Sequence, residues 1–141
     1  MSVVDTVVVD AGVLLAAADR DDADHRSCAE LLREHRSGLF VPVPVIPETA
    51  WQIERNLGPR SEASFLRLIT TGRLQVVDLS VADYERCITL IETYHDLGLG
   101  LVDASVVTVA ENLGTATIAT LNQRDFKVVR PRHVPAFELI P

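Results

Sequence analysis

Short apolar runs alternate along the chain with longer amphipathic stretches, and this alternation predicts the order of the secondary-structure elements. Thr6–Val9 is an uninterrupted β-branched run, which is typical of a strand in a parallel sheet that is covered on both faces. Further strands are expected at Leu39–Val41, Leu74–Leu79 and Thr115–Thr120, with Val128–Val129 as another candidate. The runs therefore predict a buried, mainly parallel sheet.

Helices are predicted between the strands, where the apolar period lengthens and cap residues appear. They are expected over Gly12–Ala18, from an Asp24 N-cap through His35, over about Glu48–Asn56, from Ser61 and Glu62 to Gly72, from a Ser80 cap to about His95, and over Asp103–Leu113. Strands that alternate with helices imply right-handed crossovers. The chain is therefore predicted to be a single domain, residues 1–141, with an α/β fold: a three-layer α/β/α sandwich around a central, mainly parallel sheet.

Prolines, glycines and cap residues set the expected boundaries of these helices. Three prolines between positions 42 and 47 interrupt the backbone before the third helix, and Gly58-Pro59 should end that helix. Ser80 and Asp83 have the spacing of a capping box, with Asp in place of the usual Glu or Gln. Gly114 is expected to end the apolar helix that begins at Asp103.

The composition is that of an ordinary globular protein, and it narrows the classes of function. Hydrophobic residues make up 48% of the 141 residues and charged residues 23%, which argues against disorder. The net charge of −7 argues against a general nucleic-acid binder, which would normally be basic. It does not exclude an enzyme that handles RNA locally, because a bound metal ion reverses the sign of the charge at an acidic site.

Two smaller features bear on partners and location. A basic segment follows the last apolar run and is either a set of phosphate contacts or a solvated loop; it contains Arg124, Lys127, Arg130, Arg132 and His133. Cys28 and Cys87 form no CxxC pair and occupy apolar helical positions, so they are interpreted as core thiols in a reducing cytoplasm. No apolar run reaches membrane-spanning length without a charge, so no membrane partner is expected.

Carboxylates recur at the ends of the apolar runs, where an α/β fold builds its ligand site. Asp10 follows the first strand, and Glu48 opens a helix after the prolines. Asp96 and Asp103 bracket a glycine-broken segment. Ligands in open parallel sheets bind beyond the carboxyl ends of the strands. Because Mg²⁺ and Mn²⁺ prefer oxygen ligands, the pattern predicts metal-dependent phosphate chemistry.

Each of these acids also has a purely structural explanation. Asp10 precedes a predicted helix and Asp103 begins one, and an aspartate at the start of a helix is commonly its N-cap. Glu48 would be favoured in a first helical turn by the macrodipole alone. Asp96 is different, because a negative charge near a predicted helix C-terminus opposes the dipole by about 0.3–1 kcal/mol. That cost indicates another role, such as metal coordination, unless Asp96 is a solvent-facing loop residue.

Four segments of the chain carry a resemblance to a known family. They are Val8–Asp10, Pro47–Glu48, His95–Ser105 and Ile118–Phe126, which together span nearly the whole chain. In this order they resemble the PIN-domain family, and within it the VapC-type toxins of bacterial toxin–antitoxin pairs. The Asp-Ala step into an apolar helix and the T-L-N-x-x-D-F ending are specific when they occur together. The resemblance implies a Mg²⁺- or Mn²⁺-dependent endoribonuclease, in which water attacks an RNA phosphodiester and leaves a 5′-phosphate and a 3′-hydroxyl.

The resemblance also implies roles for the acidic residues. Asp10 and Asp103 match the principal metal ligands of the family. Glu48 and Asp96 match its remaining acidic positions, which help to bind the metal or to orient water. These four residues are therefore the expected catalytic and metal-binding set.

Three further positions are implied as supporting residues. Thr120 matches a polar residue that lines the pocket of the family. Asn122 stands where the family usually has a later acid, and it keeps one oxygen ligand but loses a charge, which puts a second tightly held metal in doubt. Asp125 either supplies the missing carboxylate or braces the loop ahead of Phe126.

Partners follow from the same resemblance. The substrate is expected to be RNA, whose identity as tRNA, rRNA or mRNA the sequence does not reveal. A cognate VapB-type antitoxin is expected to cover the site with its C-terminal segment and to present a basic side chain to the carboxylates. Relatives form homodimers, and Trp51, interpreted as a core or interface residue, would contribute with the apolar helical faces.

Two other functions compete with the nuclease. A PIN-like fold kept only for protein binding remains open because Asn122 replaces an acid. A metal-dependent phosphatase on a similar sheet is less compatible with the sequence, because Asp10 is followed by Ala11-Gly12 instead of a second acid two residues later. Cleavage of RNA separates the nuclease from both alternatives.

Overall fold

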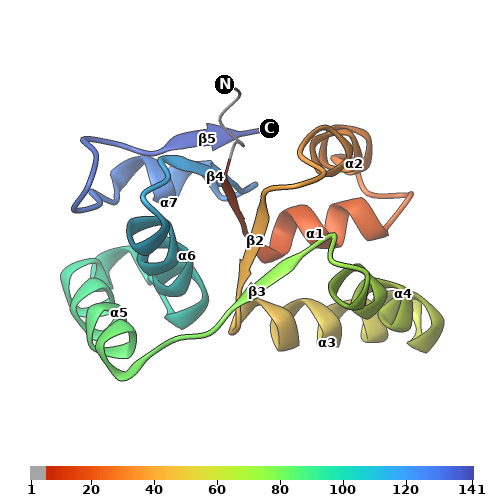
Figure 1. Ribbon diagram of the computed structural model, residues 1–141, viewed down its shortest axis with the longest axis horizontal. Coiled ribbons are helices and arrows are strands. Elements are labelled where there is room, and N and C mark those ends of the chain that lie inside the picture. Colours follow the sequence, from red (N-terminus) through yellow and green to blue (C-terminus); the bar gives the residue numbers. More distant parts are fainter. Residues whose placement is uncertain (1–5) are drawn as a thin grey trace.

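Five parallel strands form the centre of the molecule, in the spatial order β3-β2-β1-β4-β5 (Figure 1). The computed structural model describes residues 6–141, so the first five residues of the predicted domain lie outside it. The strands are β1 (Val7–Val9), β2 (Leu39–Pro42), β3 (Gln75–Val77), β4 (Thr117–Ala119) and β5 (Glu138–Ile140). Every neighbouring pair is parallel.

Helices cover both faces of this sheet. They are α1 (Ala11–Ala18), α2 (His25–Glu34), α3 (Val45–Leu57), α4 (Pro59–Thr70), α5 (Val81–Thr93), α6 (Leu101–Leu113) and α7 (Gln123–Val128), with the 3-10 turn η1 (His95–Leu97) before α6. Helices α1 to α4 pack together on one side, whereas α6 lies against β1, β2 and β4 on the other, with α5 behind it (Figure 1). The predicted three-layer α/β/α sandwich is therefore confirmed, and its sheet is entirely parallel.

The strand order places β1 and β4 side by side at the centre of the sheet. From β1 the chain winds outward through β2 to β3, then crosses back and continues outward through β4 to β5. The winding direction thus reverses between β1 and β4, where Val8 pairs with Ile118 and Val9 with Ala119. Such a reversal opens a crevice beyond the carboxyl ends of the strands, which is where open α/β sheets bind ligands.

The core consists of the central strands and one long helix. Strand β1 is completely buried, and residues 104–110 of α6 are buried along their whole length. The hydroxyls of Ser105 and Thr108 in that stretch each donate to a backbone carbonyl of the same helix, which satisfies them without solvent. Cys28 and Cys87 are buried and unpaired, as predicted. Within residues 6–141, no helix has both the length and the apolar character needed to cross a membrane.

Some predicted boundaries are correct because local cap chemistry sets them. Ser80 and Asp83 form the predicted capping box: Ser80 Oγ accepts from the Asp83 N–H at 3.1 Å, and Asp83 Oδ2 accepts from the Ser80 N–H at 2.9 Å. Gly114 ends α6 with a left-handed φ of 69°, which residues with a side chain rarely adopt. Asp24 takes the N-cap position of α2, although its side chain makes no capping bond.

Other predicted boundaries are wrong, mainly at prolines. Helix α3 begins at Val45 and not near Glu48, because Pro44 takes the N-cap position and Pro47 falls in the first turn, where no backbone N–H is needed. Helix α4 begins at Pro59 and not two residues later, because a proline suits the first helical position. Prolines that the pattern assigned to loops therefore start both helices.

The C-terminal part also differs from the prediction. Val128–Val129 is not a strand, because Val128 closes α7. The last strand is β5, which pairs with β4 at the sheet edge. The sequence pattern did not predict it, since its three residues lie shortly after Pro135 and directly before Pro141 and give too short a signal.

Candidate active site

Asp10 and Thr120 meet where the winding of the sheet reverses. Asp10 follows β1 and is only 6% exposed, and Thr120 follows β4 and is fully buried. The Thr120 hydroxyl donates to Asp10 Oδ2 at 2.9 Å, and the Ala11 N–H donates to Asp10 Oδ1 at 2.8 Å. Asp10 is thus the N-cap of α1, as its structural explanation expected, and it lies at the carboxyl end of β1. Its two oxygens are held in a fixed orientation at the sheet edge.

Two helix starts bring further carboxylates to this region. Glu48 lies in the first turn of α3, and its Oε1 accepts from Gln52 Nε2 at 2.8 Å. Asp103 lies in the first turn of α6. Gly100 takes the N-cap position of α6, so the alternative role of Asp103 as an N-cap is wrong. The Asp103 carboxylate is therefore not needed to start its helix.

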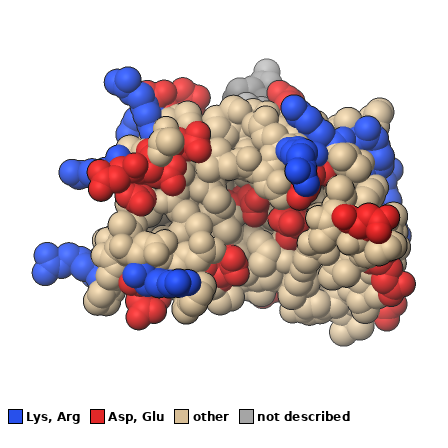
Figure 2. Space-filling view, turned by 180° about the vertical axis from the view of Figure 1, so that it is seen from behind, with Lys and Arg blue, Asp and Glu red and all other residues tan. Residues whose placement is uncertain are grey.

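The charges of these carboxylates act on one another. The pKa of Asp103 is raised to about 6, first by burial and then by the negative charges of Asp10, Asp125 and Glu48. The pKa of Asp10 is also raised, chiefly by burial and in small part by the charge of Glu48, although its two hydrogen bonds oppose the rise. We call Asp10, Glu48, Asp103 and Asp125 the carboxylate cluster. Acidic side chains occupy the hollowed middle of one face of the molecule, with Lys and Arg toward the margins (Figure 2).

Asn122 and Asp125 extend this region along the turn that leads into α7. The Asn122 N–H donates to Thr120 Oγ1 at 2.9 Å, and the Asn122 side-chain amide donates to Asp125 Oδ2 at 3.2 Å. Asp125 Oδ1 is buried and has no hydrogen-bond donor among the described residues, although Arg124 Nε lies 3.5 Å from it. The fully buried Phe126 anchors the turn in the core. The three predicted supporting residues thus lie together.

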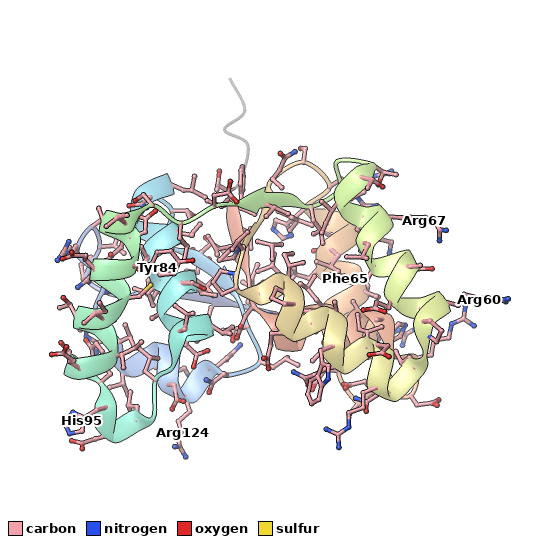
Figure 3. All side chains as sticks on the ribbon, turned by 90° about the horizontal axis from the view of Figure 1, so that it is seen from below. Arg60, Phe65, Arg67, Tyr84, His95 and Arg124 are labelled. Carbon is pink, nitrogen blue, oxygen red and sulfur yellow. The ribbon has the colours of Figure 1, made fainter. Side chains whose placement is uncertain are left out.

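Asp96 is the predicted acid that the structure does not bring to the cluster. It lies in η1, and its side chain is 93% exposed, with Oδ1 3.0 Å from His95 Nε2. His95 is at the outer end of the molecule (Figure 3). Because α5 already ends at Thr93, the Asp96 charge does not oppose the dipole of that helix as expected. Asp96 therefore matches the alternative interpretation, a solvent-facing residue.

The cluster has the donor chemistry of a site for a hard divalent cation. Its side chains offer carboxylate oxygens, and the mutual repulsion that raises the pKa of Asp103 is what a cation would relieve. Asp125 Oδ1 adds a buried oxygen that no hydrogen-bond donor satisfies within residues 6–141. In the same residues, no three His, Cys, Asp or Glu side chains already converge closely enough to hold an ion. The residues fit such a cation by their chemistry.

Two contacts of the cluster were not expected from the sequence. Gln52 orients Glu48, a contact that their spacing of four residues on one helix could have indicated. Arg124 pairs with Asp125 and is otherwise exposed at the edge of the molecule (Figure 3). Other parts of the basic segment anchor the chain: the Arg130 guanidinium bonds to the Lys127 carbonyl, and His133 Nε2 lies 2.7 Å from the Thr115 carbonyl oxygen.

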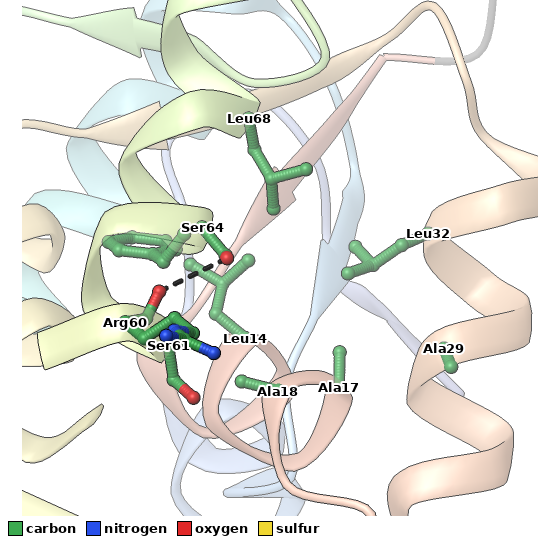
Figure 4. Close-up of a pocket in the computed structure, with 10 residues that line it drawn as sticks. Leu14, Ala17, Ala18, Ala29, Leu32, Arg60, Ser61, Ser64 and Leu68 are labelled. Atoms are coloured by element: carbon green, nitrogen blue, oxygen red, sulfur yellow. Dashed lines mark hydrogen bonds between the residues drawn. The ribbon is translucent and has the colours of Figure 1, made fainter. Parts of the chain in front are cut away.

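An apolar groove of about 450 Å³ lies on the α1–α4 side of the sheet, between α1, α2 and α4 (Figure 4). Leu14, Leu32 and Phe65 line it, together with alanines of α1 and α2 and the side chain of Arg60. No carboxylate of the cluster lines it. The groove therefore offers apolar contact and not hydrolytic chemistry.

Comparison with known proteins places this geometry in a family. The family model described as PIN domain matches residues 7–130. Ribonuclease VapC26 of Mycobacterium tuberculosis is 28% identical over 135 residues, which cover 96% of this chain and all of the relative. The crystal structure of Mycobacterium tuberculosis VapC20, described as a sarcin-ricin loop cleaving toxin, superposes with a TM-score of 0.74 at 18% identity over 80% of this chain and 87% of the other. The crystal structure of VapBC2 from Rickettsia felis, bound to a DNA fragment from the promoter, superposes with a TM-score of 0.68 at 17% identity. The superposition covers 96% of this chain and 99% of the other. The match over most of its length shows that the chain belongs to the PIN-domain family.

Proposed function

We propose that this protein is an endoribonuclease that acts as the toxin of a toxin–antitoxin pair. The observation that carries the proposal is the placement of Asp10, hydrogen-bonded to Thr120, at the reversal point of the sheet with Asp103 and Glu48 near enough to act on its charge. Alignment with Ribonuclease VapC26 over the full length of that relative supports the same activity. Action on cellular RNA would place the protein in the cytoplasm.

We further propose that the nuclease depends on Mg²⁺ or Mn²⁺. Asp10 and Asp103 would hold the cation, and Asp125 would add a third carboxylate. When bound, such a cation lowers the pKa of water and neutralises the scissile phosphate. The four carboxylates at pH 7 would otherwise repel that phosphate, so the cation also makes the site accessible to RNA.

The chain's own residues then have distinct tasks. Asp10 is rigid because two hydrogen bonds fix it, so it defines the position of the site. Glu48 is exposed and oriented by Gln52, which suits it to position the attacking water. Burial and neighbouring negative charges raise the pKa of Asp103 to about 6, and a bound cation would relieve that repulsion, which suits Asp103 to hold the cation together with Asp10. Asp96 is left out of the proposed set because of its exposure.

The function is tested with total cellular RNA and antitoxin-free protein. Cleavage is measured with Mg²⁺, with Mn²⁺ and with EDTA, beside Asp10→Asn. Discrete fragments that need metal and disappear with Asp10→Asn support the proposal. End-group analysis should find 5′-phosphates, because water and not the ribose 2′-hydroxyl attacks. A 2′,3′-cyclic phosphate would refute this mechanism, and no cleavage by folded protein would favour a binding module.

A VapB-type antitoxin is the proposed partner that silences the toxin. The acidic face attracts a basic side chain of the antitoxin. The apolar groove between α1, α2 and α4 is the surface on which we expect the antitoxin to bury a hydrophobic segment, because concave apolar patches of this kind mark interaction sites. Structures of related toxin–antitoxin complexes, such as VapBC2 of Rickettsia felis, support a partner of this class.

A homodimer is proposed as the state of the isolated chain. Trp51 is not a core residue, since it is 56% exposed with the Arg55 guanidinium carbon 5.3 Å from its ring centroid. A larger apolar stripe lies on α5, where Val81, Tyr84 and Ile88 are 78%, 44% and 55% exposed. Light scattering should give twice the chain mass of 15.5 kDa. A mass equal to that of one chain would reject the dimer.

A further inference from the structure

The single tryptophan of the chain lies exposed on α3, about one helical turn beyond Glu48. Trp51 is 56% exposed, and Glu48 and Arg55 are exposed as well. Residues three or four positions apart share one face of a helix, so these three side chains follow one another along the solvent side of α3. Thr49 and Ile53, on the other side of the helix, are fully buried. The indole therefore shares its helix face with a carboxylate of the cluster.

This face of α3 leads directly to the carboxylate cluster. The negative charge of Glu48 contributes to the raised pKa of both Asp10 and Asp103, so Glu48 lies on the side of α3 that meets the cluster. Three residues of an α-helix rise by only about 4.5 Å. The indole of Trp51 is therefore close enough to the cluster to contact a nucleotide whose phosphate is bound there.

Arg55 prepares the indole for a second planar partner. Its guanidinium carbon lies 5.3 Å from the centroid of the Trp51 ring, which is the arrangement of a cation–π pair. The guanidinium covers one face of the ring and leaves the opposite face to solvent. Within residues 6–141 Arg55 forms no salt bridge, whereas Arg86 uses its donors on Glu111. The N–H groups of Arg55 are therefore available to an anion.

The chemistry of this pair fits RNA better than it fits a protein surface. Unpaired RNA is bound by stacking its bases on aromatic side chains and by placing cations against its phosphates. Stacking does not depend on the sign of the local charge, so it can hold RNA at an acidic face of a chain whose net charge is −7. Trp51 does not line the apolar groove between α1, α2 and α4, and it is on a different helix from the apolar stripe of α5.

We propose that Trp51 and Arg55 form a substrate subsite, in which the indole stacks on an unpaired nucleobase and the guanidinium binds a phosphate of the same strand. The subsite selects single-stranded or looped RNA, because a base inside a duplex has its faces covered by its neighbours. Neither residue takes part in breaking the phosphodiester bond. The inference rests on the proposed ribonuclease function and adds to it the part of the site that recognises the substrate.

The fluorescence of the protein reports directly on this stacking, because Trp51 is its single tryptophan. The probe is a short unpaired oligoadenylate, titrated in the presence of Ca²⁺, a hard cation that carboxylate oxygens bind. A gel run after the titration checks that the RNA is intact. The unpaired strand should quench the fluorescence, and the same strand paired with oligouridylate should quench it much less. Binding of the unpaired strand without quenching would overturn the subsite.

Variants separate the role of the ring from that of the cation. Trp51→Ala should weaken binding of oligoadenylate by roughly tenfold, as for the loss of one stacked base, whereas Trp51→Phe keeps an aromatic face and most of the affinity. Arg55→Ala should reduce the slope of log affinity against log salt by about 0.7, the value for one phosphate contact of a single strand. Trp51→Ala should leave that slope unchanged, because the ring carries no charge.

Two substitutions on α4 are the matched controls. Leu66 and Arg67 are exposed there, and Arg67 lies at the outer edge of the molecule (Figure 3). Leu66→Ala and Arg67→Ala should bind oligoadenylate like wild type. Trp51→Ala removes an exposed side chain, so its thermal unfolding should stay within a few degrees of wild type. If Trp51→Ala does not fold, Trp51→Leu replaces it, since leucine is apolar but offers no flat face.

The remaining outcomes distinguish failure of the subsite from failure of the proposed function. Wild-type RNA affinity in Trp51→Ala overturns the subsite, while RNA cleavage by the wild-type protein leaves the ribonuclease standing. If Trp51→Ala keeps its RNA affinity but loses the dimer or the affinity for antitoxin, Trp51 is a protein contact and the inference is wrong. A wild-type protein that neither binds nor cleaves RNA removes the proposed function, and the subsite falls with it.

Discussion

The Thr120 hydroxyl donates a 2.9 Å hydrogen bond to Asp10 Oδ2 and so joins the carboxyl ends of the two strands between which the sheet reverses its winding. Both residues are buried, and Thr120 Oγ1 also accepts from the Asn122 N–H. One hydroxyl therefore satisfies a carboxylate and a backbone donor together. The shape of the site depends on a residue that carries no charge.

Replacing Thr120 by valine tests this dependence. The similar shape of valine keeps the packing but leaves Asp10 Oδ2 and the Asn122 N–H without a partner, which should cost about 1–3 kcal/mol of unfolding free energy. Mn²⁺ affinity should fall as well, since Asp10 loses its fixed orientation. Chemical denaturation and calorimetry measure the two effects. Thr120→Ser keeps the hydroxyl and should stay close to wild type in both, and equal losses in both variants would argue against the hydrogen bond as the cause.

The raised pKa of Asp103 predicts a pH-dependent stability. Its folded-state pKa of about 6 lies above the ordinary value of 3.8, so between these values the folded state holds a proton that the unfolded state has lost. Ionisation of Asp103 therefore destabilises the fold as the pH rises from about 4 to above 6. Asp103→Asn removes this penalty and should raise Tm by roughly 2–4 °C at pH 7 in EDTA. The rise in Tm of Asp103→Asn over wild type should vanish near pH 4.

Thermal scans of Asp103→Asn and wild type between pH 4 and 8 check this expectation. Asp21→Asn, a change of the same kind in an exposed loop, is the control and should follow wild type at every pH. A gain that stays constant over the whole range would show that the effect comes from packing and not from charge. Saturating Mn²⁺ should reduce the advantage of Asp103→Asn, because wild type then gains the free energy of binding.

The sequence was sufficient for the parts of the fold and site that local patterns determine. The buried run before Asp10 predicted β1 and its carboxylate, and the spacing of Ser80 and Asp83 predicted their capping box. Patterns failed where the outcome depends on tertiary neighbours. The residues around Asp96 do not show that its side chain faces solvent. The identity of Asn122 does not show that its side-chain amide donates a hydrogen bond to Asp125. Such facts follow from packing between segments distant in the chain.

The family resemblance implies that Asp96 belongs to the catalytic set, whereas the structure places its side chain in solvent. The variant Asp96→Asn tests which of the two is correct. The Asp96 side chain is 93% exposed and its partner is His95 on the surface, so its removal should change Mn²⁺ affinity and RNA cleavage by less than about twofold. Asp10→Asn, measured in parallel, should abolish both. A loss in Asp96→Asn comparable to that in Asp10→Asn would mean that η1 moves toward the cluster when metal or RNA binds, and Asp96 would then rejoin the proposed set.

Filling the apolar groove tests the proposed antitoxin surface apart from catalysis. Ala18 is an exposed residue that lines the groove, so Ala18→Arg places a long cation there without removing any core contact. Affinity for the cognate antitoxin should fall by about tenfold or more, equivalent to ~1.4 kcal/mol, while Tm and RNA cleavage by the free toxin stay unchanged. Ala82→Arg makes the same change on exposed α5 and should bind the antitoxin like wild type. Full affinity in Ala18→Arg would exclude the groove, and a loss in both variants would indicate a general effect of added charge.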